Sequence, residues 1–491
     1  PSGTRLRRVG PGRVAGWEDR MNRHSFRKAF FHGDWVERCG WNGFDFPDRC
    51  FDVQEYGTPA DGIFPATAGI QSAIDACYVG GGGWVRVPRG RYLVGSLFLK
   101  SNVHLVLEEG AELLASMDLA DYPEDRTRVA GVEIDWPLAV LNINMAENVR
   151  ISGPGKVQGR GFPFWTRFRH MQSVYEANGL RWALDYDCKR PRMLVAANSR
   201  NIRLDDFTLE ESAFWTVQVV YCEEVTIDGV TIRNNRAEFH GPSSDGIDID
   251  SSRFVLVENC DVDCDDDNFC LKAGRDADGL RVNRPCCHVV IRNNRTGAGA
   301  GLVTFGSETS GGIHHVLVQN MRAEGTARGI RFKSARTRGG FIENILVEDV
   351  EICDVPFPFE FMMDWNPAYS YCRLPDAYVG REIPHHWKVL TEPVTPLERG
   401  ICPLRNVLFA NITVRGKCWK CFKVEGFSEE PIGGLVFENC KVETETGGEI
   451  RHACDWSAPG SSFRFEDGEP VEQENTAGLA DELTGEHRPI P

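Results

Sequence analysis

The stretch from Asn201 to Ile291 contains one short pattern four times. The four copies are Asn201-Ile-Arg-Leu204, Glu224-Val-Thr-Ile227, Phe254-Val-Leu-Val257 and His288-Val-Val-Ile291. Most residues of each copy are β-branched or aliphatic, which favours strands. Each copy is followed by a second short strand-like run and a turn. The spacing between successive copies is typical of solenoid proteins.

Further copies continue the pattern towards the C-terminus. They are His315-Val-Leu-Val318, Asn344-Ile-Leu-Val347, Asn406-Val-Leu-Phe409 and Gly434-Leu-Val-Phe437. The segments between copies are too rich in Gly, Asn and Asp to form amphipathic helices, so the strands have to be connected within coils that stack about 4.8 Å apart. We predict an all-β fold, a right-handed single-stranded parallel β-helix. The alternative is a β-propeller, whose repeats are longer and contain more strands each.

The two ends of the array differ from its repeats. Residues 66–77 place Ile70, Ala73, Ile74 and Cys77 on one helical face. Because a solenoid has to cover its open end, this segment predicts an N-terminal capping helix. Three regions are expected: an Arg-rich N-terminal extension that wraps the solenoid (1–57), the β-helix (58–456), and an acidic tail that is surface-bound or disordered (457–491).

The composition of the 491 residues excludes several classes of function. The 55 Lys and Arg against 71 Asp and Glu give a net charge of -16, which disfavours binding to nucleic acid or anionic membranes. No run approaches the roughly 20 apolar residues of a membrane span. Most of the 17 cysteines are expected to be buried thiols. Cys418 and Cys421 lack the second pair that would support a metal site.

The densest acidic stretch of the array holds the candidate site. Asp245 precedes Asp266, and Asp267 follows directly. Because the separation of Asp245 and Asp266 is close to the length of one coil, a parallel β-helix would bring these carboxylates to one face on neighbouring coils. Their mutual repulsion would raise at least one pKa and provide both an acid and a base. Two alternatives stay open here: aspartates that fill turns, and a calcium site.

Two cations follow the acidic cluster along the chain. Arg331 and Lys333 have i, i+2 spacing and therefore point the same way on a strand. Cations beside carboxylates argue against a calcium cage. They suit a substrate that carries its own carboxylate, held by charge-assisted hydrogen bonds. The alternative is that they serve only as counter-ions to the acidic cluster.

Several segments match, in order, the motifs of one enzyme family. They are Gly81-Gly-Gly-Trp-Val-Arg-Val-Pro88, Gly95-Ser-Leu-Phe-Leu-Lys100, Leu107-Glu-Glu-Gly-Ala111, Phe214-Trp-Thr-Val217, Ser243-Ser-Asp-Gly-Ile-Asp-Ile-Asp-Ser251, Asp266-Asp267 with Leu271-Lys-Ala-Gly274, Gly306-Ser-Glu308 and Arg331-Phe-Lys333. With these segments the chain resembles glycoside hydrolase family 28, the polygalacturonase family, and in particular its bacterial exo-acting members. The resemblance spans roughly Phe51 to Glu443.

This resemblance implies exo-acting hydrolysis, with inversion, of α-glycosidic bonds in galacturonic-acid-containing pectic polysaccharide. Asp266 would be the general acid, Asp245 and Asp267 would activate water, and Arg331 and Lys333 would bind the uronate carboxylate. Glycoside hydrolysis does require one protonated and one ionised carboxyl. The implied partner is an acidic plant cell-wall polysaccharide or oligosaccharide. No cofactor or metal is expected. The implied location of the protein is secreted or periplasmic.

Two departures from the family pattern bear on specificity. Ala300 stands where the family has a histidine, and Ser243-Ser244 replaces Asn-Thr. A rhamnogalacturonan or another acidic glycan is therefore an alternative substrate. His240, just before Asp245, could supply an imidazole or could be a turn histidine on the surface.

Further binding residues are expected around the aspartates. Trp215 and Trp365 could stack on sugar rings or pack in the core, and Glu308 is expected to contact substrate. The long insert between Val347 and Phe409 could close the groove into an exo pocket. Two other functions remain as alternatives: a β-helical polysaccharide lyase, with Lys333 as base, and a glycan-binding solenoid without catalysis.

Overall fold

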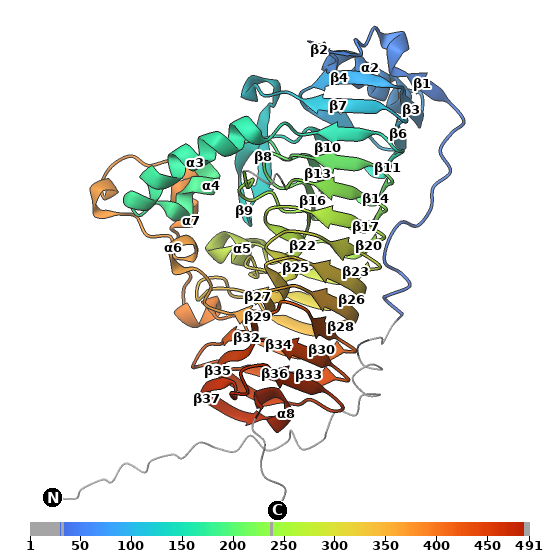
Figure 1. Cartoon of the computed structure of the whole chain (residues 1–491). Coiled ribbons are helices and arrows are strands. Elements are labelled where there is room, and N and C mark those ends of the chain that lie inside the picture. The colour runs from blue at the N-terminus through green and yellow to red at the C-terminus, as the bar shows by residue number, and fades with distance from the viewer. Residues whose placement is uncertain (1–29, 31–33, 236–238, 486–491) are drawn as a thin grey trace, which may run out of the picture.

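The computed structural model describes residues 30, 34–235 and 239–485. Within these residues, one sheet of 35 strands winds along the molecule, and the strand pairs within it are parallel (Figure 1). One separate hairpin is antiparallel. The prediction of an all-β, right-handed single-stranded parallel β-helix is confirmed.

The first face of the solenoid carries the candidate site. Its strands are β5 (Leu97–Leu99), β10 (Leu141–Asn144), β13 (Leu194–Ala197), β16 (Val217–Val220), β19 (Ile247–Asp250), β22 (Asp267–Lys272), β25 (Gly301–Phe305), β27 (Arg328–Lys333), β29 (Phe357–Met362), β32 (Lys420–Glu425) and the first half of β35 (Thr446–Trp456). Strands of neighbouring coils pair in register, so each outward side chain has a neighbour one coil away, at about 4.8 Å.

The second face contains all of the predicted copies. Its strands are β1 (Cys50–Asp52), β3 (Gly83–Val87), β6 (Val103–Leu107), β11 (Glu147–Ser152), β14 (Arg200–Asp205), β17 (Glu223–Asp228), β20 (Arg253–Glu258), β23 (Cys286–Arg292), β26 (Ile313–Glu324), β28 (Ile342–Cys353), β30 (Leu404–Ala410) and β33 (Ile432–Glu438). The first residue of each copy has a positive φ, for example 55° at Asn201. Half of the copies place asparagine or glycine there, which tolerate the left-handed region better than most residues.

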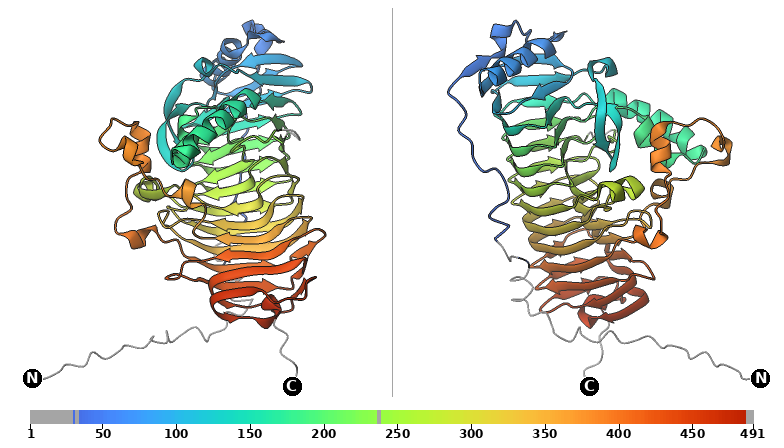
Figure 2. Two further views of the ribbon diagram at one scale, coloured as in Figure 1. Left: turned by 60° about the vertical axis from the view of Figure 1, so that its left-hand side comes forward. Right: turned by 180° about the vertical axis from the view of Figure 1, so that it is seen from behind.

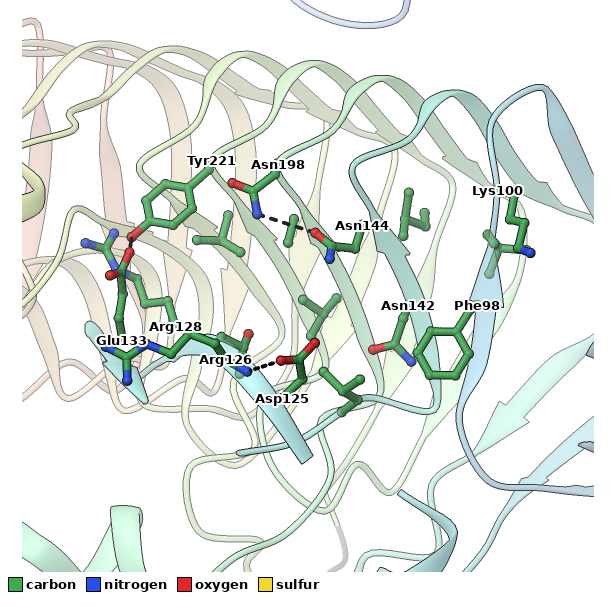
Figure 3. A pocket seen from close by; sticks show the side chains of 17 residues that line it. Phe98, Lys100, Asp125, Arg126, Arg128, Glu133, Asn142, Asn144, Asn198 and Tyr221 are labelled. Atoms are coloured by element: carbon green, nitrogen blue, oxygen red, sulfur yellow. Dashed lines mark hydrogen bonds between the residues drawn. The ribbon is translucent and has the colours of Figure 1, made fainter. Parts of the chain in front are cut away.

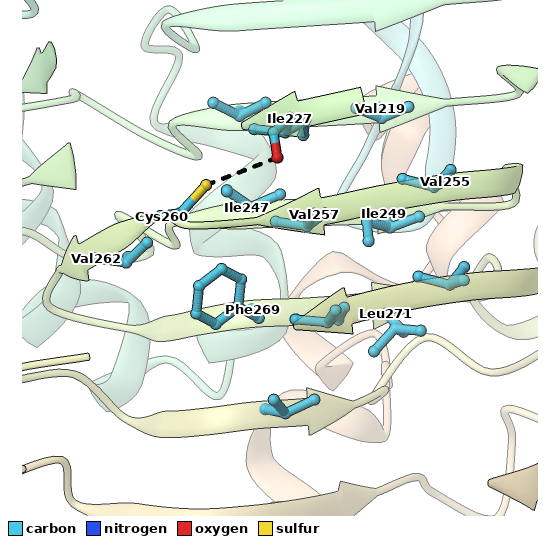
Figure 4. Packing of buried hydrophobic residues seen from close by; sticks show 14 of the residues in the cluster. Val219, Ile227, Ile247, Ile249, Val255, Val257, Cys260, Val262, Phe269 and Leu271 are labelled. Carbon is cyan, nitrogen blue, oxygen red and sulfur yellow. Dashed lines mark hydrogen bonds between the residues drawn. The ribbon is translucent and has the colours of Figure 1, made fainter. Parts of the chain in front are cut away.

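The third face closes the coil with shorter strands. They are β2 (Asp61–Pro65), β4 (Gly90–Val94), β7 (Ala111–Ala115), β12 (Lys156–Gln158), β15 (Thr208–Glu210), β18 (Thr231–Arg233), β21 (Asp261–Asp263), β24 (Arg295–Thr296), β31 (Thr413–Arg415), β34 (Lys441–Thr444), β36 (Ser462–Phe465) and the second halves of β26 and β28. Inward side chains of the three faces form one continuous core, in which Val219, Ile249 and Leu271 stack from coil to coil (Figure 4).

Helix α2 (Thr67–Val79) covers the N-terminal end of this core. Ile70, Ala73, Ile74 and Cys77 are its fully buried residues. The predicted capping helix and its apolar face are therefore confirmed. Burial of Ile70 and of Ile74 contributes about 1.5–3 kcal/mol each to folding. A short helix, η1 (Val53–Tyr56), packs against α2.

Residues 34–49 run along the outside of the second face (Figures 1 and 2). Trp35 packs edge-on against His288, with ring centroids 5.5 Å apart, and the Trp41 backbone N–H donates to Thr226 at 2.8 Å. Most of the predicted wrapping extension, residues 1–29 and 31–33, lies outside the described residues.

The solenoid continues past residue 456, where the sequence suggested that a tail begins. Strand β36 pairs with β34, and β37 (Glu472–Leu479) pairs with β35. Helix α8 (Asp481–Thr484) follows and buries Leu483 completely. The acidic composition hid these strands because their side chains are mostly exposed on the last coil.

Four insertions cover the first face. They are η2 (Leu119–Asp121) with the hairpin β8 (Glu124–Val129) and β9 (Val132–Pro137); α3 (Phe162–Ala177), η3 (Arg181–Ala183) and α4 (Leu184–Asp187); α5 (Asp276–Val282); and α6 (Pro367–Ser370), η4 (Asp376–Tyr378), α7 (His385–Leu390) and η5 (Leu397–Gly400). Several of them share a second apolar cluster that includes Trp136, Trp182 and Trp387. Figure 1 shows these insertions on one side of the solenoid.

All 17 cysteines fall in the described part of the chain and are free thiols, most of them buried. Cys418 and Cys421 are both fully buried. Among the described helices, none combines the length and apolar character that crossing a bilayer requires.

Candidate active site

The register of the first face brings the predicted aspartates together. Ile247 in β19 pairs with Phe269 in β22, and the Gly246 N–H donates to the Asp267 carbonyl at 2.9 Å. Asp245 therefore sits beside Asp266 and Asp267 on the next coil. One carboxylate oxygen from each of the three aspartates lies within 4.8 Å of the other two.

Asp267 faces the two predicted cations. Its Oδ2 accepts from Lys333 Nζ at 2.7 Å, and its Oδ1 accepts from Arg331 Nη1 at 3.2 Å and from the Thr304 hydroxyl at 2.7 Å. The carboxylate is fully buried, which by itself would raise its pKa. The charges of Lys333 and Arg331 outweigh burial and hold the pKa of Asp267 far below its ordinary value.

The neighbouring Asp266 behaves in the opposite way. Burial, followed by the charge of Asp267, raises the pKa of Asp266. Burial also raises the pKa of Asp245 well above its ordinary value, together with the nearby Asp248 and Asp266 carboxylates. The site thus combines one carboxylate whose pKa is lowered with two carboxyls whose pKa values are raised, and such separated pKa values suit acid–base chemistry.

Lys272 is a central cation that the sequence did not indicate. Its Nζ lies 3.3 Å from Glu308, 3.5 Å from Asp248 and 3.7 Å from Asp245, and 4.6 Å above the Trp215 ring. Burial would raise the pKa of Glu308, but Lys272 and other cations lower it to about 2. Alternation along β19 and β22 could have indicated Lys272 and Asp248, because both lie at outward positions of predicted strands.

A cavity of about 150 Å³ opens above these residues. Its lining includes the predicted residues Asp245, Asp266, Arg331, Lys333, Glu308, Trp215 and Trp365. Trp215 is buried in the cavity wall, whereas Trp365 is half-buried with Lys333 Nζ 4.7 Å above its ring. Asp267 is fully buried and is not among the described residues that line the cavity.

Insertions complete the cavity wall with residues that no repeat predicts. Arg181 and Asp185 come from η3 and α4, and Tyr369 comes from α6. Asp185 accepts from Arg181 at 3.0 Å, from Arg190 at 2.8 Å and from the Ser243 hydroxyl at 2.9 Å. These segments lack the strand periodicity, so the sequence carried no signal for their position.

His240 and Ala300 occupy different surroundings. The His240 side chain is 69% exposed, and its Nδ1 lies 2.8 Å from Asp265. It is not among the described residues that line the cavity. The Ala300 N–H donates to the Asp266 carbonyl at 2.7 Å, so this position adjoins the aspartates without an imidazole.

The same geometry bears on the calcium alternative. The three aspartates place oxygens close enough together to bind one cation. However, two of these aspartates are already paired with Lys272, Arg331 and Lys333. A divalent cation there would lie close to three positive charges, which disfavours it. The residues fit an acid–base site better than a metal cage.

Comparison with known proteins identifies the family. The family model for glycosyl hydrolases family 28 matches residues 86–376. The chain belongs to this family. It is 26% identical over 427 residues to a probable polygalacturonase of Vitis vinifera, covering 82% of each chain. It is 27% identical to an exo-poly-alpha-D-galacturonosidase of Dickeya chrysanthemi over 61% of this chain and 54% of that protein.

Solved structures share the fold of this family 28 hydrolase. An exopolygalacturonase of Thermotoga maritima superimposes with a TM-score of 0.66 at 22% identity, over 90% of this chain and 95% of that one. A family 28 exopolygalacturonase of Yersinia enterocolitica gives a TM-score of 0.73 at 21% identity, over 90% and 79%.

Proposed function

We propose that this family 28 enzyme is an exo-acting, inverting hydrolase that releases galacturonic acid from pectic polysaccharide. The observation that most supports this proposal is that Asp245, Asp266, Arg331 and Lys333 all line one small cavity. The relatives named as exo-acting galacturonosidase and exopolygalacturonase support the assignment. A polymeric plant cell-wall substrate also supports a secreted or periplasmic location.

Asp266 is the proposed general acid. Because its pKa is raised, it holds a proton that it can transfer to the glycosidic oxygen as the bond from that oxygen to the anomeric carbon breaks. Water attacks the anomeric carbon from the opposite face and transfers its proton to Asp245. Asp245 accepts the proton in its ionised form, and its raised pKa makes it a stronger base. Solvent then returns a proton to Asp266 and removes the proton from Asp245, which restores the starting state.

Asp267 receives a different role from the one that the family motif suggests. It lies behind the cavity, and its oxygens are taken by Lys333, Arg331 and Thr304. We therefore assign it to holding the two cations and to raising the pKa of Asp266. Arg331 and Lys333 then present their remaining N–H groups to the uronate carboxylate.

The insertions that line the cavity support exo action. Gly131, at the tip of the β8–β9 hairpin, accepts from the Arg275 N–H at 2.9 Å, and Ala130 beside it lines the cavity. Asn366 and Tyr369 from the predicted insert close another side. A polymer chain would enter with one end only, which limits cleavage to its terminal residue.

A product screen on defined pectic oligosaccharides tests this function. We expect monomeric galacturonic acid as the first product from every chain length, and proton NMR of that product should show inversion. The Asp245 and Asp266 oxygens lie within 4.8 Å, closer than the roughly 6.5–9.5 Å usual for inverting carboxyls. Inversion therefore rests on the family resemblance, and a retained anomer would overturn it. Early release of long fragments would overturn exo action.

The altered histidine position supports a second candidate substrate. Ala300 adjoins Asp266 without the imidazole that the family motif places there. A rhamnogalacturonan or another acidic glycan is therefore the second candidate, and the same screen distinguishes it by the sugar released.

A further inference from the structure

A larger cavity lies on the first face, beside the candidate active site and nearer the N-terminus. Its volume is about 440 Å³, within the roughly 300–1,000 Å³ typical of small-ligand sites. Strands β5, β10, β13 and β16 contribute one wall, and the β8–β9 hairpin contributes the other (Figure 3).

This cavity continues the outward row that carries the active site. Phe98 pairs with Asn142, and the row then runs through Val195 and Gln218 to Asp248. Both cavities therefore stand on one face of the solenoid, a few coils apart. Separate stretches of one long polysaccharide are therefore within reach of both.

The hairpin separates the two cavities. Arg128, fully buried, donates from Nη1 to Asp250 at 2.9 Å and to Ser251 at 2.7 Å. The Tyr186 hydroxyl donates to the Ala130 carbonyl at 2.8 Å. These bonds anchor the hairpin near its tip, between the two cavities.

The lining of this cavity matches an acidic sugar. Phe98 is half-buried and offers an aromatic face, while Asn144 and Asn198 are exposed and offer amides at one rim (Figure 3). The Arg126 side chain makes no ion pair with any residue that the structure describes.

Charged groups of both signs line the cavity. Of its two acidic residues, Asp125 and Glu133, the Glu133 carboxylate is already paired with Arg281 at 2.6 Å. It also accepts from the Tyr221 hydroxyl at 2.9 Å. Arg128 is fully buried and paired with Asp250, so Arg126 is the guanidinium that remains for a carboxylate, which such groups bind well.

We propose that this cavity is an accessory binding site for an acidic oligosaccharide, occupied by a stretch of the same polymer that the active site shortens. This inference rests on the proposed function for its choice of ligand. Binding there would hold the polymer near the catalytic cavity and raise its effective concentration.

Calorimetric titration of the full-length Asp266→Asn variant with trigalacturonate tests the proposal. We expect two sites. Arg126→Ala with Asn144→Ala, added to that variant, should weaken one site by about tenfold, as loss of a charge-assisted hydrogen bond predicts, and leave the other unchanged. Arg253→Ala, an exposed arginine on the second face, is the matched control and should change neither.

Three results would overturn the accessory site: a single site in Asp266→Asn, equal loss at both sites, or equally tight binding of the uncharged maltotriose in the larger cavity. Kinetics separate this failure from failure of the proposed function. With otherwise wild-type enzyme, the double variant should raise KM for polygalacturonan and leave digalacturonate turnover intact. An enzyme that releases no sugar from any pectic substrate would refute the function, while calorimetry would still decide the cavity.

Discussion

Asp266 and Asp267 are adjacent, yet replacing each by asparagine should change stability in opposite directions. Asp266 has a raised pKa because burial and Asp267 disfavour its charge. Asp267 has a lowered pKa because Lys333 and Arg331 favour its charge despite burial. The same loss of one negative charge therefore relieves the folded state at Asp266 and harms it at Asp267.

The expected magnitudes follow from these contacts. Among the described residues, Asp267→Asn leaves Lys333 without an acidic partner at bonding distance and Arg331 with Glu360 alone, at 2.8 Å. Both side chains are at most 7% exposed, and breaking a buried ion pair costs about 3–5 kcal/mol. Asp266→Asn should keep or raise the free energy of unfolding. It should lower kcat by about 10²–10⁴, the contribution of general acid catalysis.

The effects should also depend on pH with opposite sign. In the unfolded chain both carboxyls titrate near 3.8. For Asp267, whose folded pKa is lower, the stabilisation is present above pH 3.8 and is lost as pH falls. For Asp266, whose folded pKa is higher, destabilisation develops as pH rises above 3.8.

Denaturant unfolding of both variants at pH 4 and pH 7, together with kcat on trigalacturonate, measures these differences. Asp245→Asn is the matched control, because it also removes a carboxyl with a raised pKa. Stability shifts of the same sign in Asp266→Asn and Asp267→Asn would refute the reasoning. So would activity of Asp266→Asn within a few-fold of wild type.

Three further predictions concern other parts of the molecule. Arg331→Ala should raise KM for acidic oligosaccharides far more than for neutral ones, measured by initial rates; equal effects would contradict the carboxylate role. Arg128→Met should lower the free energy of unfolding by about 3–5 kcal/mol, because it leaves Asp250 buried without that partner. The variant enzyme should also release longer products than the wild type. An unchanged product pattern would show that the hairpin does not set exo action. Burial lowers the pKa of His288 and of His314 to about 4. Since unfolded histidine titrates near 6.5, stability of this face should be full above about pH 6.5 and decline towards pH 4, as hydrogen exchange of residues 34–42 would show; uniform protection would contradict it.

The sequence revealed the fold because one face repeats its pattern in every coil. The copies from Asn201 to Phe437 all fall on the second face, where a positive φ recurs at each first residue. The first and third faces have strands as well, but their shorter and more variable runs are less distinct. The last coil was missed because few of its side chains are buried, so apolar alternation is weak there.

The same repeat explains which site residues could be found. Asp245, Asp266, Arg331 and Lys333 sit on regular coils, so spacing alone places them on one face. Arg181 and other residues from the insertions reach the cavity through contacts between segments far apart in sequence, and periodicity contains no information about them. His240 failed as a cavity residue for the converse reason: it precedes Asp245 closely, but the turn directs it to Asp265 at the surface.

The net charge of -16 describes the whole surface and not the site. In a parallel β-helix, every outward side chain has neighbours one coil above and below at about 4.8 Å, so one geometry supplies both the carboxylate cluster and its counter-ions. Asp267 meets Lys333 and Arg331 across two coils, while Asp266, one residue earlier, faces the cavity. A single step along the chain thus separates a carboxylate with a lowered pKa from a carboxyl with a raised pKa. The repeat itself creates the pKa difference on which the proposed hydrolysis depends.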